Sequence, residues 1–250
     1  MYIDTHCHIS KDEYDDINEV INKLDKNYAI TSGDSHKSNI EVLEIVNRYS
    51  NIYGTIGIHP NEIADFKEEY LKFIEKNLSN QKIVGIGEIG LDYHYGKEDN
   101  EKQKEIFVKQ LDLARKYKKT VVIHSRDAAQ DTLEIIKNYP DLKIDFHCYG
   151  YSLDIAKELL KQNVKFGIGG VITFKNSRVL KEVVEFLPYE NILLETDSPY
   201  LSPEPFRGKK NIPNNVELVA KKIAEIKEIP YEKVLEITTI NAKSLFDLKI

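Results

Sequence analysis

Two histidines lie one residue apart near the start of the chain, in the stretch MYIDTHCHIS, as His6 and His8. Such a pair alone is weak evidence for a metal site, but further histidines and acids follow short apolar runs later in the chain. These residues are His59, Glu88, His124, His147 and Asp197. Together they predict a centre of imidazole and carboxylate ligands, which suits Zn, Mn, Fe, Co or Ni and, less well, Mg.

Eight apolar or β-branched runs carry these residues and alternate with amphipathic helical stretches. The expected strands are 2–6, 28–32, 52–59, 83–88, 120–124, 143–147, 164–169 and 192–197. Strand–helix alternation predicts a parallel sheet. Eight repeats in 250 residues favour closure into a (β/α)8 TIM barrel. We therefore expect one α/β domain over residues 1–250, with the histidines and acids on the barrel face where the strands end.

The number of candidate ligands favours two ions. One tetrahedral catalytic ion needs only three protein ligands and a water, and four of these five histidines with the two acids already exceed that number. Glu88, about midway round the barrel, is the candidate bridge between two ions. The period of two along the first strand predicts that Asp4, His6 and His8 share one side, with Thr5 and Cys7 facing the helices.

Other residues near the expected ligands have open roles. Cys7 and Cys148 are expected to point away from the metals. Asp145 and Glu195 are expected inside the barrel, where unpaired acids are costly. They, or Asp4, could orient ligand histidines through the second ring nitrogen. The alternative is a structural ion pair with a residue such as Lys143.

Composition limits the class of protein. The chain is 41% hydrophobic and 30% charged, and its net charge is −6. This net charge argues against a protein that binds nucleic acid through overall positive charge. Only two cysteines are present, and no stretch approaches the ~18 apolar residues of a membrane span. We expect a cytoplasmic protein with no membrane contact and no obligate protein partner.

Several blocks resemble the TatD family of metal-dependent deoxyribonucleases in the amidohydrolase superfamily. They occur in family order along nearly the whole chain: THCH, GIHP at 57–60, GEIGLDYH at 87–94, VVIHSRDA at 121–128, FHCYG at 146–150, ETDSPYL at 195–201 and RGKKNIP at 207–213. The resemblance implies a distorted TIM barrel with divalent metals that hydrolyses DNA, often described as acting at 3′ ends. The implied partner is DNA, as single strands or 3′ ends.

The resemblance also implies roles for individual residues. One ion would take His6, His8, Glu88 and Asp197, and the other Glu88, His124 and His147. The centre would hold two divalent metal ions, which could be Zn, Mn, Mg, Ni or Co. His59 and Arg126 match positions thought to contact the substrate phosphate, and Arg207 lies with Lys209 and Lys210 in a cationic loop after strand 8. Asp197 and Glu88 are the expected catalytic residues, with Asp197 orienting a water and accepting its proton.

Two other functions remain open. The same barrel could be an amidohydrolase or deacylase acting on a C–N or ester bond. Many such relatives have a carboxylated lysine on strand 4, so Glu88 favours the nuclease branch. The second alternative is a catalytically idle barrel that acts as a binding partner, but degenerate enzymes usually lose ligands first, and here every expected ligand is present.

Overall fold

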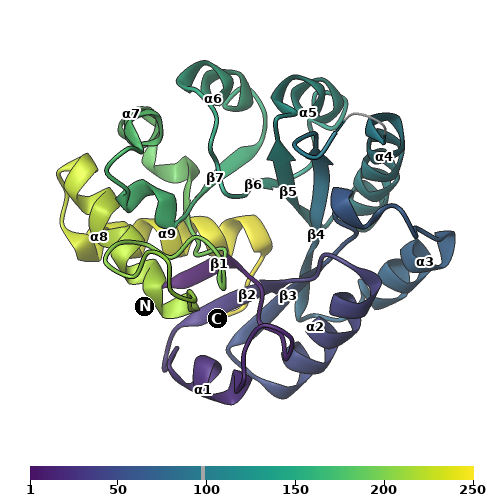
Figure 1. Cartoon of the computed structure of the whole chain (residues 1–250), viewed down its shortest axis with the longest axis horizontal. Coiled ribbons are helices and arrows are strands. Elements are labelled where there is room, and N and C mark those ends of the chain that lie inside the picture. Colours follow the sequence, from purple (N-terminus) through teal and green to yellow (C-terminus); the bar gives the residue numbers. More distant parts are fainter. Residues whose placement is uncertain (97–98) are drawn as a thin grey trace.

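The structure, a computed structural model, describes residues 1–96 and 99–250. Within them, eight parallel strands form one sheet in chain order (Figure 1). The strands are β1 (Ile3–Cys7), β2 (Tyr28–Ser32), β3 (Ile52–Ile56), β4 (Ile83–Asp92), β5 (Thr120–Arg126), β6 (Ile144–Phe146), β7 (Val164–Ile168) and β8 (Ile192–Leu194). The predicted (β/α)8 TIM barrel is confirmed, and each expected strand is present.

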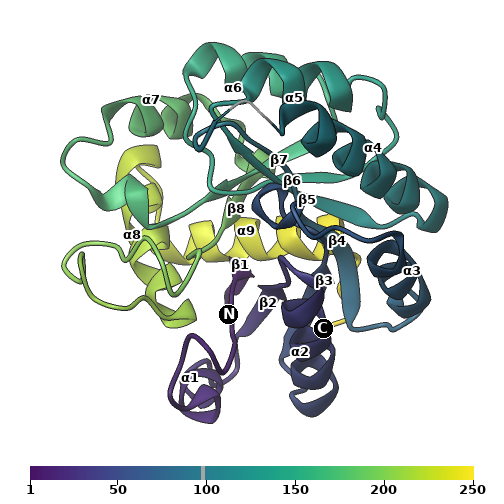
Figure 2. The ribbon, with the colours of Figure 1, turned by 45° about the vertical axis from the view of Figure 1, so that its right-hand side comes forward.

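Helices lie outside the strands and surround them, except for the last helix, which crosses one end of the barrel (Figures 1 and 2). They are α1 (Ile17–Asn22), α2 (His36–Arg48), α3 (Glu68–Asn77), α4 (Asn100–Tyr117), α5 (Ala129–Ile136), α6 (Leu153–Leu159), α7 (Arg178–Phe186), α8 (Val216–Lys227) and α9 (Tyr231–Phe246). They bury apolar faces on the sheet; α2, for example, buries Val42, Ile45 and Val46. No helix in the described ranges is long and apolar enough to cross a membrane.

The barrel closes between β1 and the segment that follows β8. The backbone N–H of Asp197 donates to the carbonyl of His6 at 2.9 Å, and that of His8 donates to Ser198 at 2.7 Å. Cys7 and Ser198 form an isolated parallel bridge. This closure brings Asp197, the last predicted ligand in the sequence, beside the first two.

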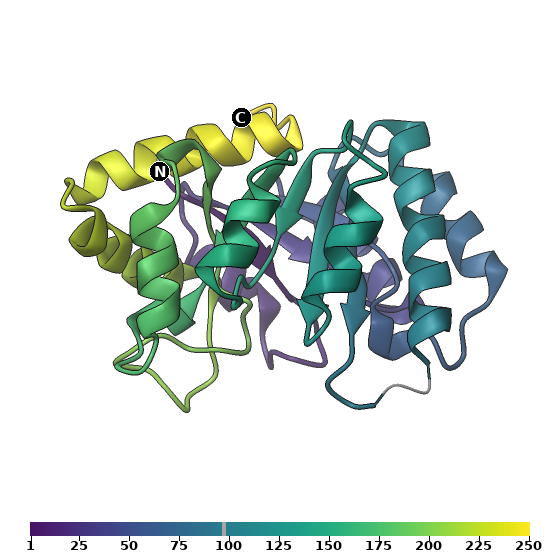
Figure 3. The same cartoon turned by 90° about the horizontal axis from the view of Figure 1, so that it is seen from above.

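Helix α9 covers the end of the barrel where the strands begin. Leu245 and Phe246 pack in one buried cluster with Ile3, Val122 and Leu193 from the strands. Figure 3 shows α9 along one side, with the loops that follow β4 and β8 extending on the opposite side. The end with the strand carboxyl termini is therefore left for a site.

The predicted alternation of side chains along β1 is wrong at Asp4 and Thr5. The register with β2 shifts between Asp4 and Cys7, so an extra residue reverses the pattern. Ile3 packs inside the barrel, and Thr5 lies against an interior acid, so Asp4 faces outward. Its carboxylate accepts from the backbone N–H and the hydroxyl of Thr196, at 3.0 and 2.6 Å. Asp4 therefore does not orient a histidine ring.

Strand β4 is longer than predicted and carries a second irregularity. Its register with β5 shifts between Ile86 and Ile89, on either side of Glu88, and pairing then continues to Asp92. A bulge of this kind redirects a side chain. Conversely, β3 and β8 end before His59 and Asp197, which lie in the following loops.

Candidate metal centre

The six side chains predicted as metal ligands meet at the carboxyl ends of the strands. Glu88 lies among them and is 4% exposed. Its Oε2 lies 3.3 Å from His6 Nε2 and 3.5 Å from His8 Nε2. Its Oε1 lies 2.9 Å from His124 Nδ1 and 2.8 Å from His147 Nε2. Each Glu88 oxygen thus faces a different pair of imidazoles.

Asp197 belongs to the group around the first two histidines. Its Oδ1 lies 3.6 Å from His6 Nε2 and 3.4 Å from His8 Nε2. The backbone of Asp197 has φ 53°, in the left-handed region that non-glycine residues rarely adopt. The chain therefore bends sharply at the residue that turns its carboxylate toward the two rings.

Ser32, at the end of β2, orients both histidines of β1. The Nδ1–H of His8 donates to the Ser32 carbonyl at 3.0 Å, and His6 Nδ1 lies 3.1 Å from the Ser32 hydroxyl. A carbonyl can only accept, so neutral His8 must hold its lone pair on Nε2, which faces Glu88 and Asp197. The sequence analysis did not identify Ser32, although it ends the expected strand 28–32.

Asp92 orients the ring of His124, as Ser32 orients His6 and His8, but it does so through Nε2 instead of Nδ1. The Nε2–H of His124 donates to Asp92 Oδ2 at 3.1 Å. When His124 is neutral, its lone pair is therefore on Nδ1, the atom that faces Glu88. Asp92 is buried, with 3% of its surface exposed, and its carboxylate also accepts from the backbone N–H of His94 at 2.9 Å. A carboxylate behind a ligand histidine is a common feature of metal sites.

His59 also faces Glu88, but the ring nitrogen that faces the carboxylate carries a proton instead of a lone pair. Its Nε2 lies 3.4 Å from Glu88 Oε1. Its Nδ1 accepts from the backbone N–H of Asn61 at 3.1 Å. Neutral His59 must therefore carry its proton on Nε2, where it is a hydrogen-bond donor and not a metal ligand. This polarity fits the predicted contact with a substrate phosphate.

The carboxylates of the centre are held in their charged form. Burial opposes ionisation of Glu88, but His147, His59 and the other imidazoles around it hold its pKa well below the ordinary value. Burial also opposes ionisation of Asp197, and its hydrogen bond with His8 lowers its pKa. Both acids are therefore anionic at neutral pH, as metal ligands must be.

The pKa values of the imidazoles are shifted in opposite directions by their surroundings. Burial lowers the pKa of His6 to about 4, so this ring is neutral. Burial acts the same way on His8 and His124, but hydrogen bonds to Asp197 and Asp92 outweigh it and raise both pKa values to about 9. Protons on these two rings hold positions that a divalent cation would take, because metal binding releases protons from its ligands.

The donor atoms are close enough to share metal ions. Two groups of predicted ligands have their donor atoms within 4.8 Å of one another: His6, Glu88 and His147; and His6, His8 and Asp197. A third group, His59, Glu88 and His124, is equally close, but His59 presents N–H to it. Imidazole nitrogen with carboxylate oxygen is the donor chemistry of catalytic divalent metal sites. The residues present therefore fit divalent metal.

The two thiols lie outside these groups. Cys7 packs in the buried layer between sheet and helices, with its Sγ 3.4 Å from the Ile30 carbonyl. Burial raises the pKa of Cys7 and of Cys148 well above the ordinary value. Neither thiol forms the thiolate that a metal would need.

Two acids are fully buried beneath the donor groups, Asp145 and Glu195. The ion pair considered for them is wrong, because Lys143 binds Asp247 at 2.8 Å on the surface. Burial raises the pKa of both acids well above their ordinary values. Glu195 Oε1 lies 3.9 Å from His147 Nδ1, which is too long for a hydrogen bond. These acids do not fix a ligand ring directly.

The predicted phosphate-binding arginines are exposed. Arg126 ends β5, and its guanidinium carbon lies 5.6 Å from the centre of the Tyr95 ring. Arg207 lies in the loop after β8, 4.3 Å from the centre of the Phe174 ring. The loop after β8 extends on the side of the molecule away from α9 (Figure 3). The arginines are therefore cations stacked on aromatic rings near the mouth of the barrel.

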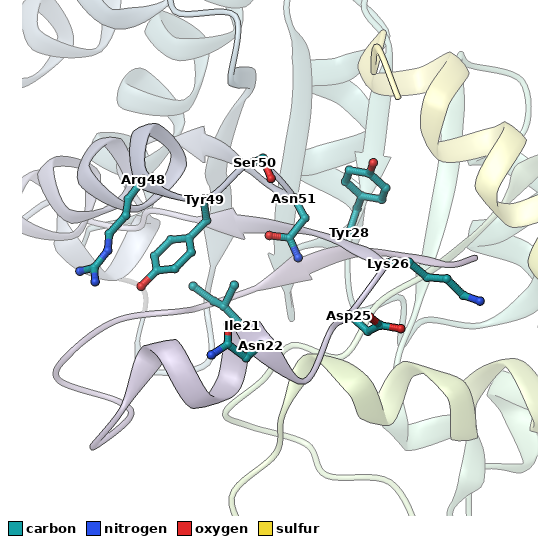
Figure 4. A pocket seen from close by; sticks show the side chains of 9 residues that line it. All are labelled: Ile21, Asn22, Asp25, Lys26, Tyr28, Arg48, Tyr49, Ser50 and Asn51. Atoms are coloured by element: carbon teal, nitrogen blue, oxygen red, sulfur yellow. The ribbon is translucent and has the colours of Figure 1, made fainter.

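A cavity of about 420 Å³ lies elsewhere, near the starts of β2 and β3, and its lining includes Lys26, Arg48 and Tyr49 (Figure 4). None of the predicted metal ligands lines it. A smaller recess of about 150 Å³ opens beside the centre, with His8 in its wall.

Comparison with known proteins gives one consistent result. A sequence model of the TatD-related DNases matches residues 3–247. The uncharacterized metal-dependent hydrolase YabD of Bacillus subtilis is 40% identical, covering 98% of this chain and 99% of its own. The uncharacterized metal-dependent hydrolase MJ1582 of Methanocaldococcus jannaschii is 38% identical, covering 100% and 98%. The crystal structure of YjjV, a TatD homologue from Escherichia coli, superposes with a TM-score of 0.91 at 26% identity, covering 99% and 98%.

Proposed function

The chain belongs to the TatD-related DNases, a family of metal-dependent hydrolases, and from this premise we propose that it hydrolyses phosphodiester bonds in DNA, from 3′ ends. The proposal includes two divalent ions, with Glu88 as their shared ligand. The observation that supports it is the position of the Glu88 carboxylate, whose two oxygens face two separate pairs of imidazoles. A pair of ions a few Å apart is typical of enzymes that cleave phosphodiesters.

When bound, divalent ions would lower the pKa of a water and neutralise charge on the phosphate. The protein's own part is proton transfer and orientation. Asp197 is ionised, and its side chain is 15% exposed, so it reaches both the buried histidines and the open mouth. Because Oδ1 faces the rings of His6 and His8, Oδ2 would accept the proton of the attacking water.

Two further groups stabilise the negative charge that the reacting phosphate gains. His59 presents Nε2–H beside the centre, since its Nδ1 is occupied by the Asn61 backbone N–H. Arg126 follows the ligand His124 by two residues and is exposed, so its guanidinium can bind a phosphate oxygen pair. Preorganised donors of this kind commonly supply the largest share of catalysis.

The proposal is tested by supplying metal-free protein with Zn²⁺, Mn²⁺ or Mg²⁺ and assaying labelled single-stranded DNA beside a panel of small amides and esters. We expect hydrolysis of DNA, lost in Asp197→Asn and retained in Asp141→Asn, which changes an exposed carboxylate paired with Arg115 in the helical layer. Fast amide or ester hydrolysis without DNA cleavage would show that the protein acts as an amidohydrolase or deacylase instead. Failure to bind any metal would support the alternative of a catalytically inactive barrel that acts as a binding partner.

A further inference from the structure

The recess beside the metal centre, which we call the His8 recess, is strongly acidic. Its wall includes the carboxylates of Asp12, Glu13, Asp34 and Glu41 and the ammonium of one lysine, Lys37. With His8 neutral, as it would be when it binds a metal ion, the four carboxylates and the one ammonium give the described wall a charge of −3, and the lysine is already paired with Asp12. The carboxylates outnumber the ammonium, so the ionised side chains of this wall together repel a phosphate.

The same recess has an aromatic wall. Tyr200 is 52% exposed, and its ring lies 6.1 Å from the ring of the predicted ligand His8. Its hydroxyl donates to Glu13 at 2.9 Å, which fixes the ring in place. An exposed aromatic ring beside a nuclease centre offers a face on which a base can stack.

The other positive charges of the mouth do not line this wall, although the ammonium of Lys210 donates to the backbone carbonyl of Glu13 at its edge. Arg126 follows β5, and Arg207 and Lys209 lie in the loop after β8; all three are exposed. None of them lines the recess. The mouth is thus divided into a cationic part, which suits a phosphate backbone, and an acidic recess with an aromatic wall.

We propose that the His8 recess holds the terminal nucleoside of the DNA strand, with its base on Tyr200, and that its carboxylates exclude any phosphate beyond that nucleoside. The proposal rests on the proposed DNA hydrolysis. An internal nucleotide carries a phosphate on both sides, whereas a 3′-terminal one carries none on its far side. Charge in the recess would therefore select the end of the strand. At about 150 Å³ the recess is smaller than most ligand pockets, which also limits it to part of one nucleotide.

The test uses two single-stranded oligonucleotides of one sequence, ending in a 3′-hydroxyl or a 3′-phosphate. We expect kcat/KM to be about tenfold lower or more for the phosphorylated end, the factor that ~1.4 kcal/mol of repulsion gives. In the double variant Glu13→Gln/Glu41→Gln this ratio should fall several-fold. Glutamine keeps the oxygens that accept from Tyr200 and from the Lys11 backbone.

The control is Glu232→Gln/Glu236→Gln, which removes two exposed carboxylates from α9 at the opposite end of the barrel. This variant should keep the wild-type ratio. Equal hydrolysis of the two ends by the wild type, or an unchanged ratio in the recess variant, would overturn the inference while leaving DNA hydrolysis intact. Absence of cleavage of either oligonucleotide would instead refute the proposed function, and the inference with it.

Discussion

Replacing Asp92 by asparagine tests how the protein prepares a metal ligand without touching the metal. The Asp92 carboxylate accepts the Nε2 proton of His124, and this bond keeps the Nδ1 lone pair directed at Glu88. Asparagine has nearly the same shape but no charge. Its amide can also present N–H to His124, and the ring would then carry its proton on the atom that should bind metal.

The expected magnitude follows from how partners behind ligand histidines act in other metal sites. Partners behind a ligand histidine typically contribute 10–100-fold in metal affinity, which is about 1.4–2.7 kcal/mol. Burial opposes ionisation of Asp92, yet its bond with His124 and its other hydrogen bonds lower its pKa from 3.8 to about 2. The surroundings of Asp92 therefore favour its charged form, which the neutral asparagine cannot supply.

The measurement is a competition titration of Zn²⁺ or Mn²⁺ against a chelator, with circular dichroism as a check on folding. The control is Asp127→Asn, which weakens a similar carboxylate–histidine pair, with His94 at 3.0 Å, among exposed groups. We expect Asp92→Asn to lose at least about tenfold in affinity for one ion and Asp127→Asn to match the wild type. If folded Asp92→Asn binds metal as tightly as the wild type, the orientation argument is refuted.

Three further predictions use other parts of the structure. His59→Ala should lower kcat about 10²–10³-fold, as loss of one transition-state donor does, with unchanged metal content by elemental analysis; a drop in bound metal would instead make His59 a ligand. In metal-free protein, His8 and His124 have folded pKa values of about 9 against 6.5 in the unfolded chain, so their stabilisation is complete below pH 6.5 and is lost as pH rises through 9. Urea unfolding should therefore show stability falling by a few kcal/mol from pH 6.5 to 9.5, and a flat or rising profile would contradict these assignments. Leu245→Ala, beneath the barrel on α9, should cost about 2–5 kcal/mol of unfolding free energy while kcat/KM at 20 °C stays near wild type; a large loss of activity in the folded variant would show that α9 influences the site.

The barrel was predictable because its signals are local and repeat. Apolar runs alternate with amphipathic stretches, and parallel strands force their carboxyl ends onto one face. This rule alone placed Glu88 and the four histidines predicted as ligands together, although they are spread over more than half of the chain.

Finer features of the site depend on contacts that spacing does not encode. The register shifts at Asp4–Cys7 and around Glu88 arise where β1 and β4 pair with their neighbours, so strict alternation failed at Asp4. Ser32 gave no signal beyond its place at a strand end. The proton position on His59 depends on one backbone N–H, that of Asn61, which only the folded loop brings to it.

The central claim is tested most directly by titrating metal-free protein with Mn²⁺, at protein concentrations above the dissociation constant, while following hydrolysis of 3′-labelled single-stranded DNA. A centre built around a shared Glu88 predicts that activity rises to a plateau at two equivalents per chain. Full activity at one equivalent would contradict the shared carboxylate, and no DNA hydrolysis at any ratio would contradict the proposed function.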